Sequence, residues 1–317
     1  MILVAGSANL DFVVRAPHIP RPGETVLGRD FKTYPGGKGA NQAVACARTG
    51  GVPTQLLVAL GDDACATPIE ASLREAGVTL NVVRAAGHPT GTAFICVSDD
   101  AENAITVAPG ANQCLQAPHL PPLTGVTHLL MQLEIPLATV TAYAQAARQQ
   151  GVTVVLNAAP APAHGLPAAL LDCVDILIVN EGELATVCQH TGTVAHRLKH
   201  LNAPTVVVML GRKGCIARSQ GAFYLQPAFR VNAIDTTAAG DSFCGSLVAA
   251  LSQGSDLPNA LLRASAAGAL ACLQRGAQVS IPTAHDVTHF LAQQTSPDAT
   301  AIKNLSAFCG LADTTPA

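Results

Sequence analysis

The chain has 317 residues, a formal net charge of −3, a hydrophobic content of 49% and a charged content of only 12%. This length fits one large domain or two ordinary ones. Because the sequence has no run of Lys and Arg and no Trp, we expect no nucleic-acid partner. No apolar run approaches the ~20 residues that a membrane span requires, so we expect no membrane partner either.

The ten cysteines indicate a reducing environment. None forms a C-x-x-C pair, and several lie in apolar runs, such as Cys272 in GALACL. Buried, reduced thiols of this kind are typical of cytoplasmic proteins. The N-terminal MILVAGSANL lacks the basic start of a signal peptide and is typical of a first strand. We therefore expect a cytoplasmic protein.

Short β-branched or Leu-rich runs alternate with Ala-rich helical stretches along the chain. Strands are predicted at 2–6, 55–61, 128–134, 153–159, 175–180 and 205–211. Helices are predicted at 40–49, 66–77, 137–151 and 194–201. Each strand is apolar on both faces, as buried parallel strands are. The pattern predicts an α/β fold with a doubly wound, mainly parallel sheet flanked by helices, whose ligands bind at the carboxyl ends of the strands.

Two regions interrupt this alternation. Residues 12–33 and 90–107 contain segments of alternating polarity, such as GTAFICV, with little helical character. We interpret them as short antiparallel strands that project from the main sheet and form a lid. The predicted domain covers residues 1–292. Residues 293–317 are interpreted as a polar, loosely attached tail.

The common nucleotide-binding motifs are absent. SANLD rather than G-x-G-x-x-G follows the first strand, and G-x-x-x-x-G-K-[ST] does not occur. His196 and His200, like His285 and His289, have the i, i+4 spacing of metal ligands but lack the Glu of H-E-x-x-H. We interpret both pairs as solvated helix faces.

Polar residues follow several of the predicted strands. Asn9 and Asp11 come after the first strand, where a carboxylate and an amide could bind a vicinal diol; an Asx turn is the alternative. GGKGAN opens the helix at 40–49 and offers Lys38 and Asn41 as donors, or is merely a flexible helix entry. Other carboxylates and amides at strand ends could contact hydroxyl groups or metal-bound water, or be surface groups: Glu134, Asn180, Glu181 and Glu183.

The stretch IDTTAAGDSF, residues 234–243, is the most specific signal. Four small positions from Ala238 to Asp241 can direct backbone N–H groups into one concavity at the start of a helix, which suits phosphate oxygens. A carboxylate would weaken a pure anion site. Its presence fits a base that takes a proton from an attacking hydroxyl while the N–H groups stabilise the phosphoryl group. A capping role for Asp241 alone does not explain Ala-Ala-Gly.

Over residues 2–290 the sequence resembles the PfkB, or ribokinase-like, carbohydrate kinases. The resemblance rests on GSANLD, GGKGANQAVACARTGG, MQLEIP, VNEGE, DTTAAGDSF and RGAQVSIPT. It implies an α/β core with a β-strand lid that also forms a homodimer interface. It also implies transfer of phosphate from ATP, with Mg²⁺, to a sugar hydroxyl, for which O5 of ribose is the expected acceptor.

The resemblance also assigns residues. Asp241 looks like the base, with an anion hole at Ala238, Ala239 and Gly240. The sugar would contact Asn9, Asp11, Gly37, Lys38, Asn41, Glu134 and Asp241. ATP would contact Asn180, Glu183, Met209, Gly211, Gly214 and Ser265, with Glu183 also acting on Mg²⁺ through water. A potassium site that orders the anion-hole loop would involve Asp235, Thr237, Ala271, Gln274, Gly276 and Ser280.

Three departures from the family pattern are evident. Met209-Leu210-Gly211 replaces Thr-x-Gly, so a hydroxyl near the nucleotide phosphates is lost and ATP affinity is expected to be weaker. Asn157-Ala158-Ala159-Pro160 replaces N-P-A-P, and Ser265 replaces an Asn near the adenine. Two alternatives stay open: a kinase for deoxyribose, fructose or adenosine, and a catalytically silent sugar-binding protein.

Overall fold

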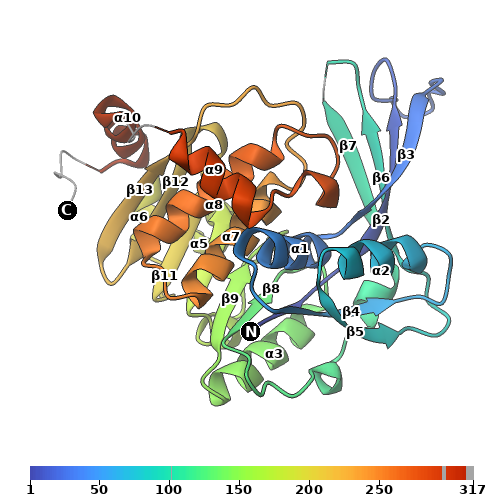
Figure 1. Cartoon of the computed structure of the whole chain (residues 1–317), viewed down its shortest axis with the longest axis horizontal. Helices are drawn as coiled ribbons and strands as arrows, with labels where there is room; N and C mark the ends of the chain where they lie inside the picture. Colours follow the sequence, from blue (N-terminus) through green and yellow to red (C-terminus); the bar gives the residue numbers. More distant parts are fainter. Residues whose placement is uncertain (101, 295–297, 312–317) are drawn as a thin grey trace.

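The computed structural model describes residues 1–100, 102–294 and 298–311, and confirms the doubly wound α/β fold (Figure 1). The main sheet has nine strands in the order β13-β12-β11-β10-β9-β8-β1-β4-β5. Seven of these strands are parallel to one another: β1 (Ile2–Ala5), β4 (Thr54–Leu60), β5 (Thr79–Arg84), β8 (His128–Met131), β9 (Thr153–Asn157), β10 (Ile176–Asn180) and β11 (Thr205–Met209). An antiparallel hairpin, β12 (Gly214–Ser219) and β13 (Ala222–Pro227), completes one edge.

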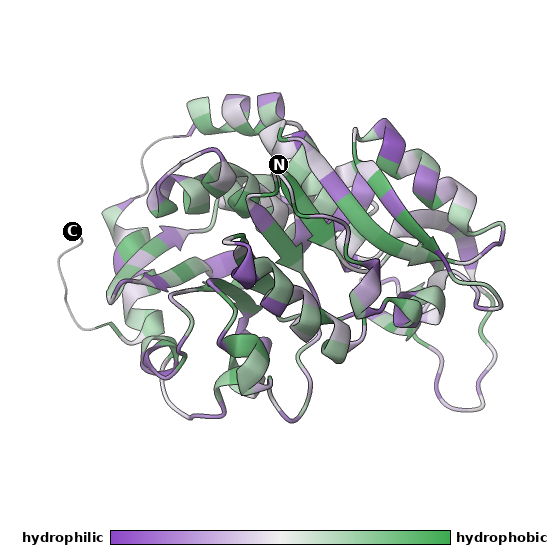
Figure 2. Cartoon of the chain, turned by 90° about the horizontal axis from the view of Figure 1, so that it is seen from below, coloured by the Kyte–Doolittle hydropathy of each residue, from purple (hydrophilic) through white to green (hydrophobic). Residues whose placement is uncertain are grey.

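Helices cover both faces of this sheet because the strands are apolar on both sides. Along β1, Leu3 and Ala5 enter one core and Ile2 and Val4 enter the other. The first core also receives α3 (Leu137–Gln149), α4 (Ala168–Leu171), α5 (Glu181–Cys188), α6 (Val194–Lys199) and α10 (Ala299–Cys309). The second receives α1 (Lys38–Gly50), α2 (Ala66–Glu75), α7 (Ala239–Ser252) and α8 (Leu257–Ala271), with α9 (Ala284–Ala292) packed outside α8. Figure 2 shows the resulting hydrophobic colour of the central strands.

A second sheet projects from the carboxyl edge of the first, at the upper right of Figure 1. Its strand order is β3-β2-β6-β7, with bounds Arg29–Gly36, Asn9–Arg15, Gly91–Val97 and Asn103–Ala108. The expectation of purely antiparallel strands was wrong, since β2 and β6 are parallel. The reason is that β2 follows β1 in the chain and β6 follows β5. Because β1 and β5 run in the same direction, the chain leaves the main sheet at the same edge after each of them, and β2 and β6 continue in that common direction.

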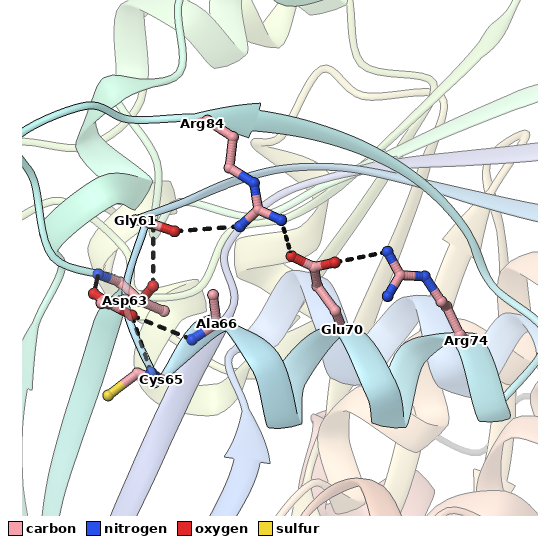
Figure 3. A network of polar contacts seen from close by, with 8 residues as sticks. Gly61, Asp63, Cys65, Ala66, Glu70, Arg74 and Arg84 are labelled. Carbon is pink, nitrogen blue, oxygen red and sulfur yellow. Dashed lines mark hydrogen bonds and ion pairs between the residues drawn. The ribbon is translucent and has the colours of Figure 1, made fainter.

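A network of charged groups anchors the base of this second sheet (Figure 3). Asp63, at the start of α2, accepts hydrogen bonds from the backbone N–H groups of Ala66 (3.2 Å) and Thr90 (2.7 Å), the latter just before β6. Beside it, Glu70 is 7% exposed and forms ion pairs with Arg74 and Arg84. These contacts tie the chain that enters β6 to the first turns of α2.

Two further expectations require correction. The strand predicted at 128–134 ends at Met131, so Glu134 lies three residues beyond it. Residues 298–311 of the predicted tail include α10, in which Leu305 is 3% and Cys309 0% exposed. These apolar side chains pack against the core, so this stretch is a packed helix rather than a loose tail; the rest of the predicted tail beyond residue 294 lies outside the described residues. The domain limit at residue 292 stays a prediction. Within the described residues, no helix is long and apolar enough to cross a membrane.

Candidate active site

Asp241 lies in the first turn of α7, and α1 holds its carboxylate from the other side. Asn41 Nδ2 donates to Oδ2 at 2.9 Å, and Gln42 Nε2 donates to Oδ1 at 2.9 Å. Both donors lie near the start of α1, shortly after the GGKG turn. That turn requires Gly37, which has φ of +88° and packs against the backbone of Ala8, where a Cβ would come within 2.7 Å. Asn41 Oδ1 is buried and has no hydrogen-bond partner among the described residues, so an acceptor is available beside the carboxylate.

The turn before α7 has the backbone geometry of an anion site. Ala238 is the N-cap and has φ of +59°, a left-handed conformation that costs a non-glycine residue about 1–2 kcal/mol. Ser242 N–H makes the first helical bond, to the Ala238 carbonyl, so the N–H groups of Gly240 and Asp241 precede the helical ladder. The Ala239 N–H donates to Thr236 O at 3.2 Å. Of the three expected anion-hole residues, Ala239 therefore has its N–H group engaged within the turn, whereas the N–H of Gly240 precedes the helical ladder and can receive an anion.

A set of polar residues lies between Asp241 and the second sheet, at the point where the strand order of the main sheet reverses between β1 and β8. Asn9 and Asp11 belong to β2, the first strand of the lid, rather than to a loop. Glu134 Oε2 accepts hydrogen bonds from Ser7 Oγ (2.5 Å) and from the backbone N–H of Lys38 (3.1 Å). The lid, the first helix and the β8 connection thus contribute to one polar site.

Charge is concentrated around Asp11. Burial, and then the negative charges of Glu134 and Asp241, raise the pKa of Asp11 from 3.8 to about 7. The carboxylate fits only because Gly36 lacks a side chain, since a Cβ there would lie 2.2 Å from Asp11 Oδ2.

Lys38 balances part of this negative charge. Burial opposes its ionisation, but the charges of Asp241, Glu134 and Glu183 outweigh burial and raise the pKa of Lys38. The lysine is therefore a permanent cation among three carboxylates.

A cavity of about 450 Å³ lies on the other side of the α7 turn. Four residues expected at the nucleotide line it: Met209, Gly211, Gly214 and Ser265. Its walls are mostly apolar and come from β11, α7, α8 and the segment 228–233, which the sequence did not indicate. The Met209 thioether lies beside Gly240, with Sδ 3.9 Å from the position that a Cβ would take. The size and lining suit a small organic ligand.

Asn180 and Glu183 lie outside this lining, at the start of α5. They form a reciprocal cap in which Asn180 N–H donates to Glu183 Oε2 and Glu183 N–H donates to Asn180 Oδ1, each at 2.8 Å. Burial raises the pKa of Glu183, the Asn180 N–H and Lys38 lower it, and Asp241 raises it again, with a net rise. The influence of Lys38 and Asp241 places Glu183 at the rim of the same site.

The loop before α7 is tied to the segment after α8. Asp235 accepts hydrogen bonds from Thr237 N–H (2.9 Å), Thr237 Oγ1 (2.6 Å) and Gly276 N–H (3.0 Å). Burial opposes the charge on Asp235, but these hydrogen bonds outweigh it and lower the pKa. Of the other residues expected at potassium, Ala271 ends α8, Gln274 follows it, and Ser280 Oγ donates to Ala277 O at 2.8 Å. The sequence-distant halves of the expected potassium site are therefore adjacent.

Comparisons with known proteins identify the family. The model of the pfkB family of carbohydrate kinases matches residues 1–284. The chain belongs to this family.

Relatives of this carbohydrate kinase match over nearly their whole length. A ribokinase from Haemophilus influenzae is 37% identical over 92% of this chain and 98% of its own. Crystallised Thermotoga maritima ribokinase is 34% identical with a TM-score of 0.84, and Arabidopsis thaliana ribokinase complexed with ribose and ATP is 32% identical with a TM-score of 0.83. Each structural match covers 92% of this chain and 99% of the other.

Sequence reasoning missed three polar residues of this carbohydrate kinase site. Gln42 directly follows Asn41, so its proximity to Asp241 could have been inferred once α1 was placed. Ser7 lies between β1 and β2 and donates to Glu134. Asn112, in the short helix η1 (Gly110–Cys114), donates from Nδ2 to Asn9 Oδ1 at 2.8 Å. No local pattern distinguishes Asn112, because its partners lie about a hundred residues away.

Proposed function

We propose that this chain is an ATP-dependent ribokinase that transfers the γ-phosphoryl group of ATP to O5 of D-ribose. The observation that carries the proposal is the position of Asp241. Its carboxylate is held by Asn41 and Gln42 between a polar site under the lid and a cavity of about 450 Å³ at the α7 turn. Two substrates bound on these two sides would meet at one carboxylate. The near full-length similarity to ribokinases supports ribose as the sugar.

In the proposed mechanism, Asp241 accepts the proton of the sugar hydroxyl while the oxygen of that hydroxyl attacks the γ-phosphorus. A new O–P bond forms while the bond from the γ-phosphorus to the bridging oxygen breaks, and ADP leaves with that electron pair. Free N–H groups at the α7 turn stabilise the charge on the transferred phosphoryl oxygens. Asn9, Asp11, Lys38, Asn41 and Glu134 orient the sugar. Asp241 then releases its proton to solvent.

The residues present fit the two expected metal ions. Mg²⁺ keeps most of its water and is held through few carboxylates and the substrate phosphates, where it neutralises developing charge. Glu183, with its negative neighbour Asp241, suits a contact through water.

Potassium would require mainly neutral oxygens. Only one carboxylate, Asp235, lies in the loop before α7, and the last carbonyls of α8, including that of Ala271, have no helical partner. No described group of three or more His, Cys, Asp or Glu side chains could hold a metal ion, and a site with a single carboxylate and backbone carbonyls does not require such a group.

The second part of the proposal is a homodimer formed through the lid. Phe12 stacks on Phe31 and Phe94 with ring centroids at 6.1 and 5.4 Å, yet Phe31 is 64% and Phe94 55% exposed. A second copy would cover these rings. Analytical ultracentrifugation tests this: the native chain should sediment as a dimer and Phe31→Glu/Phe94→Glu as a folded monomer, while a monomeric native chain would contradict it. All ten cysteines are free thiols, which supports a cytoplasmic location.

The test of the proposed activity is ADP release from ATP·Mg²⁺ with ribose, 2-deoxyribose, fructose or adenosine, each in potassium and in sodium. We expect strong turnover with ribose that potassium increases. Strong preference for another acceptor would contradict ribose and retain the kinase chemistry. Sugar binding without any ADP release would contradict the kinase and favour a silent binding protein.

A further inference from the structure

Gln42 lies behind the proposed base and is fully buried. Its side-chain nitrogen donates two hydrogen bonds, to Asp241 Oδ1 and to Asn157 Oδ1, each at 2.9 Å. Its side-chain oxygen accepts one from Gln132 Nε2 at 2.6 Å. The three partners come from different parts of the chain: Asp241 from α7, Asn157 from the end of β9, and Gln132 from the connection just after β8.

The orientation of the Gln42 amide follows from its partners. An ionised carboxylate only accepts hydrogen bonds, so the nitrogen of Gln42 must face Asp241. Asn157 uses its own Nδ2 to donate to Ile178 O at 3.1 Å and therefore presents its oxygen to Gln42. Exchanging the oxygen and nitrogen of Gln42 would place an acceptor against two acceptors. The amide is thus held with both hydrogens committed.

We propose that Gln42 is a positioning residue for phosphoryl transfer, which fixes the plane of the Asp241 carboxylate. One donor alone, Asn41 on Oδ2, would leave the carboxylate free to rotate about its Cβ–Cγ bond. A second donor on Oδ1 removes that freedom. Because Gln42 is also bonded to the last residue of β9 and to the residue that follows β8, it couples the helix-borne carboxylate to the main sheet. The proposal rests on the proposed role of Asp241 as the base.

Two variants separate donation from packing. Gln42→Met keeps the volume and removes all amide bonds, and Gln42→Glu keeps the shape but replaces the donor with an acceptor. We expect kcat with ribose to fall about 10- to 100-fold in both, the cost of a small misplacement of a reacting group, with KM for ribose within about threefold. Because hydrogen bonds to a carboxylate favour its ionised form, the acid limb of the pH–kcat profile should move to higher pH.

The matched control is Gln55→Met. Gln55 also makes two side-chain hydrogen bonds: it donates to Met1 Sδ and accepts from Asn81 Nδ2. It lies near the start of β4, at the amino ends of the parallel strands, whereas Asp241 lies at their carboxyl ends. We expect an unchanged kcat and pH profile for this variant, with thermal unfolding measured for all three.

Wild-type kcat and pH profile in Gln42→Glu would refute the donor role, as would an equal loss of kcat in Gln55→Met. Asp241→Asn, assayed in parallel, separates the two claims. If it stays active, the assignment of the base fails; if it is inactive while Gln42→Met is normal, only the positioning role fails.

Discussion

Asp11 offers a prediction that links stability to function. The unfolded chain releases this proton near pH 3.8, whereas the folded chain keeps it to about pH 7, so between these values the folded state binds more protons. Stability therefore falls as the pH rises through this window. Each pH unit is worth about 1.4 kcal/mol, so the cost of ionising Asp11 is about 3 kcal/mol between pH 5 and 7 and about 4 kcal/mol over the whole window.

Asp11→Asn removes this cost and keeps the shape of the side chain. We expect urea denaturation to show that the variant gains up to about 3 kcal/mol over the wild type on going from pH 5 to pH 8. The same change should raise KM for ribose about 10- to 100-fold at pH 8, because a neutral amide replaces a charged carboxylate as the partner of the sugar hydroxyls. The exposed Asp172→Asn is the control and should follow the wild type. Identical pH dependence of stability in the wild type and Asp11→Asn would refute the reasoning.

Three further predictions concern other parts of the molecule. Met209→Thr should lower KM for ATP about 2- to 10-fold, the worth of one added hydrogen bond. An unchanged KM would show that Met209 in place of Thr does not weaken ATP binding. Glu70→Ala leaves two half-exposed arginines without their partner and should lower the free energy of unfolding by about 1–3 kcal/mol in urea denaturation; a loss below about 0.5 kcal/mol would mean that solvent screens the network. Asp235→Asn should abolish the increase of kcat by potassium over sodium while leaving the rate in sodium within about threefold, and full activation in the variant would exclude Asp235 from the cation site.

The sequence was most informative where local pattern and burial agree. The runs around Val4, Val155, Ile178 and Val207 are apolar on both faces and form the central parallel strands. The turn at Gly37 and the small residues before Asp241 indicated two helix starts, and both helices exist. Here a few neighbouring residues determine the backbone, so the sequence is sufficient.

Contacts between residues far apart in the chain could not be predicted from the sequence. The parallel pairing of β2 with β6 depends on where β1 and β5 end in the main sheet, which neither segment encodes. The helix α10 buries only two side chains, Leu305 and Cys309. Its apolar stripe is so short that the mainly polar composition of the segment predicted a loose tail. Gln42 was missed for a related reason: its partners Asn157 and Asp241 lie 115 and 199 residues away. Only the fold brings them together.

The most direct test of the account compares formation of ribose phosphate by the wild type and Asp241→Asn, followed by ³¹P NMR at saturating ribose and ATP·Mg²⁺. We predict that the wild type forms ribose 5-phosphate. The variant should stay folded and bind ribose with a Kd within about threefold, but form product about 10²- to 10⁴-fold more slowly, the usual worth of a general base. A variant as fast as the wild type, or phosphate on a hydroxyl other than O5, would contradict the account.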